Sequence, residues 1–254
     1  MSETLATLEV SEKIGTLTLR RPEARNALSI PLLDDLLACV SELESTVDAG
    51  RPTVLVVTGE GRAFCAGMDL KAVMGDPEAP PQLLNRIADL SVRLRSLPQV
   101  VVAQVNGAAI GGGCGLACAC DLLVTHADAK LGFPEVDLGV CPAVVAPLLV
   151  RKIGPGRARR VLLSGGVMSG SEADALGMVD ALAPDRDSLG QVAEELAKRL
   201  ASGGPAALAA TKRLLNELDG SVDGSRALLG AEISASVLRG EEARTMLAKA
   251  FAGS

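Results

Sequence analysis

The residues of this chain that most directly suggest chemistry are three consecutive glycines, Gly111 to Gly113. They follow a β-branched run, Val100 to Val105, that is typical of a buried strand, and they precede an apolar run, Leu116 to Cys120, that is typical of a buried helix. Glycines leave the main chain bare, and main-chain amides at a helix N-terminus point towards negative charge. The stretch therefore predicts a site that stabilises a developing anion.

A second glycine turn has the same setting. The apolar run Val54 to Thr58 predicts a short buried strand, and the loop after it reaches Gly67 and Met68. Two such turns, each placed after a buried strand, can direct two amides at one oxygen atom. That arrangement is the geometry of an oxyanion hole.

Other residues that could carry chemistry are weaker candidates. Cys114 and Cys118 lie four positions apart on the predicted helix, but no histidine lies near them, so we predict packing and not a metal site. His126, the single histidine, is predicted in a loop without a role as a base. The triplet does not continue as GxGxxG, because Leu116 stands at the last glycine position, and this argues against nucleotide binding.

Charge and hydropathy exclude further classes of function. The 254 residues carry a net charge of −6, and no basic stripe appears in the sequence, so we expect no nucleic-acid partner. The first ten residues lack the charged-then-apolar pattern of a signal peptide, and no apolar run approaches the ~18 residues of a membrane helix. We therefore expect a cytoplasmic protein that does not associate with membranes.

The elements that must position these turns alternate along most of the chain. Residues 5–10 and 16–20 predict a hairpin, Ser29 predicts the N-cap of a helix that runs to about Val47, and residues 82–97 predict a second helix. Strands and helices alternate to about Leu182, whereas helical patterns fill the remainder. We expect an α/β core at residues 1–186 and a helical C-terminal region at residues 187–254.

Five motifs, taken together and in order, make the chain resemble the crotonase (enoyl-CoA hydratase/isomerase) superfamily. They are RPEARNALS, FCAGMDL, NGAAIGGGCGLACACD, FPEVDLGVCP and SEADALGMVD. The resemblance implies an α/β fold, a crotonase-like spiral of ββα repeats with a C-terminal helical trimerisation region. It also implies an acyl-coenzyme A thioester as substrate, no separate cofactor, and a homotrimer or hexamer.

Matching the motifs residue by residue, the resemblance implies three groups of site residues. The amides of Met68 and Gly112 would form the oxyanion hole, and Glu135 would be the catalytic carboxylate. The substrate would meet residues in or near the first two motifs and one on the predicted helix, namely Arg25, Ala27, Ala66, Asp69, Leu70, Lys71 and Gly115.

The chain departs from the pattern of the family at one informative position. Hydratases of the family commonly use two glutamates, but Gly115 stands where the first is expected, which leaves Glu135 to act as both base and acid. The same glycine occurs in hydratases similar to the 3-methylglutaconyl-CoA type, so we favour hydration of a 2-enoyl-CoA, with a branched acyl chain as one option. A Δ3,Δ2-enoyl-CoA isomerase, which needs one proton shuttle, and a catalytically silent acyl-CoA binding protein are the alternatives.

Overall fold

The computed structural model describes residues 4–46, 50–70, 79–220 and 222–252. Its strands form two sheets. The larger sheet has the order β1-β2-β3-β5-β7-β10, and the smaller has the order β4-β6-β8-β9. The larger sheet consists of β1 (Ala6–Ser11), β2 (Ile14–Leu19), β3 (Val54–Gly59), β5 (Val100–Val105), β7 (Leu122–His126) and β10 (Ala181–Ala183). The smaller sheet consists of β4 (Ala63–Cys65), β6 (Ala108–Ile110), β8 (Lys130–Gly132) and β9 (Val167–Ser169).

From β3 to β8, successive strands alternate between the two sheets. The chain passes from β3 to β4, from β5 to β6 and from β7 to β8, each time leaving the larger sheet for the smaller one. The hairpin of β1 and β2 is antiparallel, β2-β3-β5-β7-β10 is parallel, and β9 pairs antiparallel with β8. The alternation confirms the predicted α/β class and its ββα repeats.

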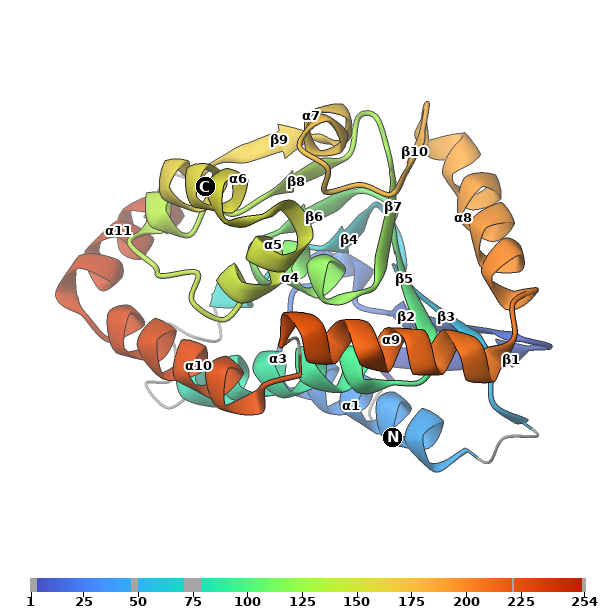
Figure 1. The fold of residues 1–254 in the computed structure, drawn as a ribbon. Coiled ribbons are helices and arrows are strands. Elements are labelled where there is room, and N and C mark those ends of the chain that lie inside the picture. Colours follow the sequence, from blue (N-terminus) through green and yellow to red (C-terminus); the bar gives the residue numbers. More distant parts are fainter. Residues whose placement is uncertain (1–3, 47–49, 71–78, 221, 253–254) are drawn as a thin grey trace.

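Helices cover both faces of the larger sheet, as Figure 1 shows. On one face lie α1 (Ile30–Ser45), α3 (Ala79–Ser96) and α4 (Gly112–Ala119). On the other lies α8 (Arg186–Ala201), which packs Leu189 and a row of alanines against Val56, Val102 and Val124. Burial on both faces explains why β3 and β5 are continuous apolar runs and do not alternate.

The remaining helices lie in the connections between strands and in the C-terminal part of the chain. They are η1 (Pro22–Ala24), η3 (Val136–Leu138), α5 (Ala146–Ile153), α6 (Pro155–Ser164), α7 (Gly170–Ala175), α9 (Pro205–Asp219), α10 (Gly224–Leu238) and α11 (Glu241–Ala252). In Figure 1, α10 lies along α3. The predicted division at residue 186 coincides with the first residue of α8, and it stays a prediction.

Two local predictions around the glycine triplet need correction. The helix begins at Gly112 and not near Leu116, so two of the three glycines lie in its first turn. The short strand β6 lies between β5 and the triplet, although the sequence predicted a direct passage from strand to turn. Three residues are too few to show a period of two, which is why the sequence did not reveal β6.

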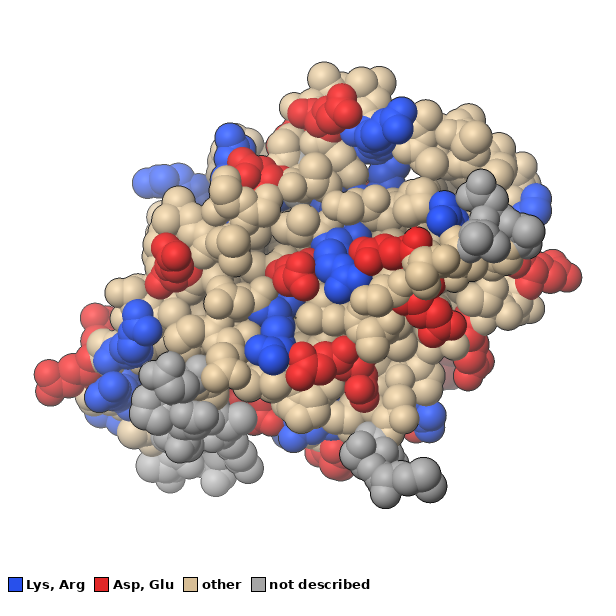
Figure 2. Space-filling model, turned by 90° about the horizontal axis from the view of Figure 1, so that it is seen from below, with Lys and Arg blue, Asp and Glu red and all other residues tan. Residues whose placement is uncertain are grey.

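Charge on the face seen from below is mixed. Figure 2 shows basic and acidic side chains interspersed there, without a continuous basic patch. Ion pairs join α3 to α1 through Arg86 with Asp34 (2.6 Å) and Arg93 with Glu44 (2.5 Å). Among the described residues, no helix is long and apolar enough to cross a membrane. The cytoplasmic location stays a prediction.

Helix α9 contacts the core through polar side chains. The Nζ of Lys212 lies 2.7 Å from Oδ2 of Asp121 and donates to the carbonyl of Gln99 at 2.8 Å. The side-chain nitrogen Nδ2 of Asn216 donates to the backbone carbonyl of Arg95 at 2.8 Å. Lys212 and Asn216 are the buried members of this helix, so its attachment depends on a buried ion pair and hydrogen bonds.

We predict that Lys212→Ala destabilises the protein by about 3 kcal/mol, because it leaves the carboxylate of Asp121 without its cation. Chemical denaturation of both proteins measures the difference. The matched control is Lys198→Ala, which breaks an exposed pair with Glu194 on α8 and should cost under about 1 kcal/mol. Equal costs for the two variants would contradict the role assigned to Lys212.

Candidate active site

The turn that carries Met68 is held by the loop before α1. The amide of Leu28 donates to the carbonyl of Gly67 (2.7 Å), and the amide of Asp69 donates to the carbonyl of Leu28 (2.9 Å). These two bonds form a parallel bridge in which the partners of Leu28 flank Met68. The bridge does not use the amide of Met68, which therefore points to the opposite side of the turn.

A buried asparagine fixes the loop that supports this turn. The side-chain oxygen of Asn26 accepts from the amide of Arg21 at 2.8 Å, and its nitrogen donates to the carbonyls of Glu60 (3.0 Å) and Ala63 (2.9 Å). Asn26 is fully buried and has φ of 55°, a left-handed conformation that asparagine tolerates better than most residues. Asn26 belongs to the motif RPEARNALS, whose sequence alone gives it no role, and these side-chain contacts show that it holds the loop in place.

The second turn lies against the first. The amide of Gly111 donates to the carbonyl of Gly132 at 2.8 Å, which places Gly112 as the first residue of α4. Its amide is therefore one of the four at a helix N-terminus that lack an intrahelical acceptor. A Cβ built on Gly67 would lie 3.5 Å from the nitrogen of Gly112, and one built on Gly112 would lie 3.9 Å from the nitrogen of Met68. The backbone segments that carry the amides of Met68 and Gly112 are therefore in direct contact.

Glu135 brings its carboxylate to the same place. A Cβ built on Gly111 would lie 2.9 Å from Oε1 of Glu135, so the acid packs directly on the second turn. Its other oxygen, Oε2, is buried and has no hydrogen-bond partner within the described part of the chain. Burial disfavours the charged form and raises the pKa of Glu135 to about 7. A carboxyl group of this kind can both accept and return a proton near neutral pH.

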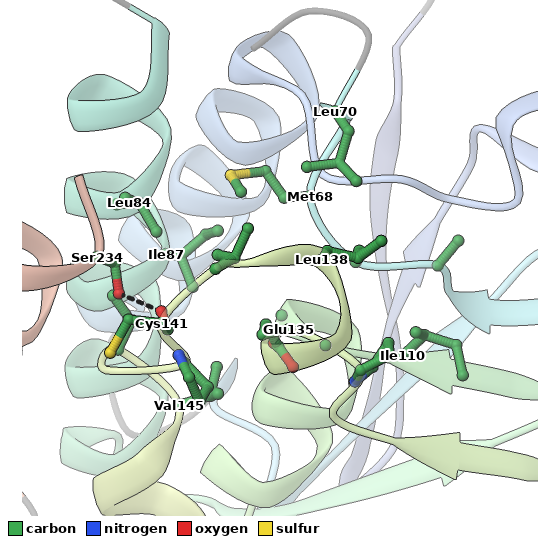
Figure 3. A pocket seen from close by; sticks show the side chains of 18 residues that line it. Met68, Leu70, Leu84, Ile87, Ile110, Glu135, Leu138, Cys141, Val145 and Ser234 are labelled. Atoms are coloured by element: carbon green, nitrogen blue, oxygen red, sulfur yellow. Dashed lines mark hydrogen bonds between the residues drawn. The ribbon is translucent and has the colours of Figure 1, made fainter. Parts of the chain in front are cut away.

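The two turns and Glu135 line one cavity of about 90 Å³. Figure 3 shows Glu135 facing into it, with Met68 and Leu70 on one side and Leu84 and Ile87 of α3 nearby. The rest of the described wall is mostly aliphatic: Ala66, Ile110, Pro134, Leu138, Val140, Cys141, Pro142, Val144 and Val145, with Ser234 of α10. The cavity is therefore an apolar chamber with one ionisable carboxyl group.

The structure brings five of the predicted site residues to this cavity: Ala66, Met68, Leu70, Gly112 and Glu135. The other described ones are not among its lining residues: Arg25, Ala27, Asp69 and Gly115. Arg25 is exposed, and its carbonyl accepts from the amide of Ala66. Asp69 pairs with Arg21, whose guanidinium also donates to the carbonyl of Ala27. Lys71 falls outside the described residues, and binding roles for all of these positions stay predictions.

The remaining candidates take no part in the cavity lining. Cys114 and Cys118 are buried, and their mutual hydrogen bond raises the pKa of the Cys114 thiol, as burial also does. Within the described ranges, no three His, Cys, Asp or Glu side chains are placed to hold a metal ion. His126 lies at the end of β7 and not in a loop, and burial lowers the pKa of its ring.

Because the pKa of Glu135 rises on folding, its charge should cost stability at high pH. The native state holds a proton that the unfolded chain has lost between pH 4.5 and about 7, so the free energy of unfolding falls across that window. We predict that the free energy of unfolding of Glu135→Gln, relative to that of the wild type, increases by up to about 3 kcal/mol as the pH rises from 4.5 to 8. Denaturant titrations across this range measure the gain. Glu9→Gln, on an exposed strand, should show no such trend, and a flat difference for Glu135→Gln would contradict the desolvated carboxyl.

Comparisons with known proteins agree with this geometry. A family model described as enoyl-CoA hydratase/isomerase matches residues 9–226. A putative enoyl-CoA hydratase of Thermus thermophilus is 39% identical over 212 residues, which cover 82% of each chain. The 2,3-dehydroadipyl-CoA hydratase of Escherichia coli is 36% identical over 85% of this chain and 83% of its own. The crystal structure of an enoyl-CoA hydratase/isomerase from Xanthobacter autotrophicus superposes with a TM-score of 0.83 at 28% identity and covers 100% of this chain and 99% of its own. The chain belongs to the enoyl-CoA hydratase/isomerase family.

Proposed function

We propose that the protein adds water across the 2,3 double bond of a 2-enoyl-CoA, with Glu135 as its single proton-transferring group. The observation that carries the proposal is the buried carboxyl oxygen of Glu135, to which no described residue donates a hydrogen bond, in the cavity lined by Met68 and Gly112. Family membership supports an acyl-CoA thioester as the substrate class.

Addition of water to C3 moves negative charge onto the thioester oxygen. The amides of Met68 and Gly112 are the donors that would hold this oxygen as the enolate forms, in a chamber whose aliphatic wall strengthens electrostatic interactions. One such donor is typically worth about 3 kcal/mol of transition-state stabilisation. The main chain supplies both donors, so their positions depend on the two turns.

A single carboxyl group must then serve twice. Ionised Glu135 takes a proton from water as the oxygen bonds to C3, and the protonated acid returns a proton to C2 of the enolate. Every proton is accounted for, because water provides both the hydroxyl on C3 and the hydrogen on C2. A pKa of about 7 keeps both forms of Glu135 populated at neutral pH.

We favour a short, uncharged acyl chain, with the branch at C3 that the resemblance suggests. The cavity is small and apolar, and no Lys or Arg occurs among its described lining residues. 3-Methylglutaconyl-CoA, the branched example that the resemblance suggests, carries a second carboxylate that this wall does not pair. 3-Methylcrotonyl-CoA has the same branch without that charge and is the better match to the wall described here.

Migration of a double bond from the 3 to the 2 position is the second candidate. Gly115 removes the other expected carboxylate, and an isomerase needs one group to move a proton from C2 to C4. The oxyanion hole would serve this reaction equally well. A silent acyl-CoA binding protein would keep the cavity but show neither reaction.

Parallel assays of crotonyl-CoA, 3-methylcrotonyl-CoA, 3-methylglutaconyl-CoA and a 3-enoyl-CoA separate these outcomes. We expect hydration to dominate, with kcat/KM rising with pH to a plateau through an apparent pKa near 7. Glu135→Gln should lower kcat at least ~100-fold, as loss of a general acid–base group does, whereas Glu9→Gln should leave it unchanged. Full hydratase activity in Glu135→Gln would refute the mechanism, and double-bond migration without hydration would favour the isomerase.

We also propose that the protein is a homotrimer or a hexamer, as the resemblance implies. Because α9 meets the core through Lys212 and Asn216, its leucines face outwards: Leu214, Leu215 and Leu218 are 55%, 55% and 76% exposed. Neighbouring α10 exposes Leu228, Leu229 and Ile233. Exposed leucine and isoleucine side chains on two successive helices support a protein–protein contact there.

Leu218→Glu should therefore shift the mass measured by light scattering from the oligomer towards the monomer, because it places a charge among the exposed leucines of α9. Val10→Glu, at a half-exposed position of the edge strand β1, is the matched control and should leave the mass unchanged. An oligomer that survives Leu218→Glu at micromolar concentration would contradict an interface centred on α9.

A further inference from the structure

The space in front of Gly115 is occupied by a valine from another segment. Gly112 and Gly115 are three residues apart in α4 and therefore share one face of the helix, the face that Gly112 presents to the cavity. A Cβ built on Gly115 would lie 2.1 Å from Cγ1 of Val145 and 2.7 Å from its Cβ. No side chain fits at position 115 while Val145 keeps its place.

Val145 has little freedom to move aside. It is the N-cap of α5, its amide donates to the carbonyl of Pro142 at 3.2 Å, and its carbonyl accepts from Leu148 and Leu149 at 3.1 Å. The side chain is 4% exposed and β-branched, and branching at Cβ restricts rotation about χ1. Its two methyl groups are therefore held in one position.

Helix α10 holds the loop that precedes Val145. The hydroxyl of Ser234 donates to the carbonyl of Cys141 at 2.8 Å, a bond drawn in Figure 3, and accepts from the amide of Ala143 at 3.1 Å. A Cβ built on Gly230 would lie 2.6 Å from the carbonyl oxygen of Ala143, so the helix packs directly on the loop. The place of Val145 is thus set from two sides, by α10 through the loop and by α4 through Gly115.

We propose that Val145 determines acyl specificity: packed on Gly115, it forms an apolar wall beside Glu135 that receives an apolar substituent on C3 of the acyl chain. The inference rests on the proposed function, in which Glu135 acts on C2 and C3, so that a side chain lining the same cavity can contact a substituent on C3. Val145 and Glu135 line one cavity, and Figure 3 shows them near each other. A second carboxylate at position 115 would place a polar group on the side where the structure has two methyl groups.

Binding of saturated thioesters tests the wall without any need for turnover. The probes are butyryl-CoA and 3-methylbutyryl-CoA, which differ by one methyl group on C3, and calorimetry gives the dissociation constant of each. In Val145→Ala we expect the preference for the branched thioester to fall about four- to tenfold, because the substituent loses its contact. Val150→Ala, on the exposed side of α5, should leave the preference unchanged.

The contact between Gly115 and Val145 can be tested separately, by measuring Tm. Gly115→Ala should lower Tm by at least ~4 °C, because the added methyl overpacks against Val145. The same substitution in the Val145→Ala background should lower Tm much less, since the obstructing atoms are gone. An equal loss in both backgrounds would show that Val145 does not reserve this space and would overturn the pairing.

The outcomes separate this inference from the proposed function. An unchanged branched-to-linear preference in Val145→Ala, or a shift towards the branched thioester, would overturn the role of Val145 even in an active hydratase. Absence of turnover with all four unsaturated substrates would instead refute the proposed reaction, while the calorimetric preference would still decide the role of the wall.

Discussion

Direct contact between two stretches of main chain is the constraint on which this site depends. A Cβ on Gly67 would lie 2.6 Å from the carbonyl oxygen of Ile110, and one on Gly113 would lie 2.2 Å from that of Cys65. A side chain at either position would push the turn that follows β4 away from the first residues of α4. The smaller sheet aligns the two stretches, since β4 and β6 are adjacent parallel strands, and the chain leaves both strands at the same edge. The two amides that we propose as the oxyanion hole lie close together because only backbone lies between the turns.

The desolvation that makes Glu135 useful also makes it costly. Its carboxyl group lies against Gly111 in an aliphatic chamber, and Oε2 has no partner in the described structure. Some other buried polar side chains do have partners. Asn26 hydrogen-bonds three backbone groups beneath the first turn, and Lys212 pairs with Asp121 beneath α9. A buried, desolvated carboxyl group that lines a cavity is typical of a functional site. Gly115 offers no second carboxylate, so the reaction that we propose depends on this one group.

The sequence predicted those parts of the site that depend on local chemistry. Glycine at 67 and at 111–113 could be interpreted before the structure was known, because close approach of main chain leaves few alternatives to glycine. The hairpin, the helix capped by Ser29 and the buried strands β3 and β5 also followed from their patterns. The contacts between distant residues could not be predicted in this way. Val145 packs on Gly115 although the two residues are 30 positions apart in the sequence. Ser234, on helix α10, hydrogen-bonds the loop before Val145. Neither residue type carries a signal of its own, since a valine in an apolar run and a serine in a helix are ordinary.

The central claim is that one desolvated carboxyl group, Glu135, titrates near neutral pH in the cavity beside the two amides. Carbon-13 NMR of protein labelled at the glutamate carboxyl carbon follows that group directly, and the signal absent from Glu135→Gln assigns it. We expect a titration midpoint near 7 for this signal, well above the ordinary glutamate value of 4.5. A midpoint at the ordinary value near 4.5 would mean that the carboxylate is solvated and that the acid–base role assigned to Glu135 is wrong.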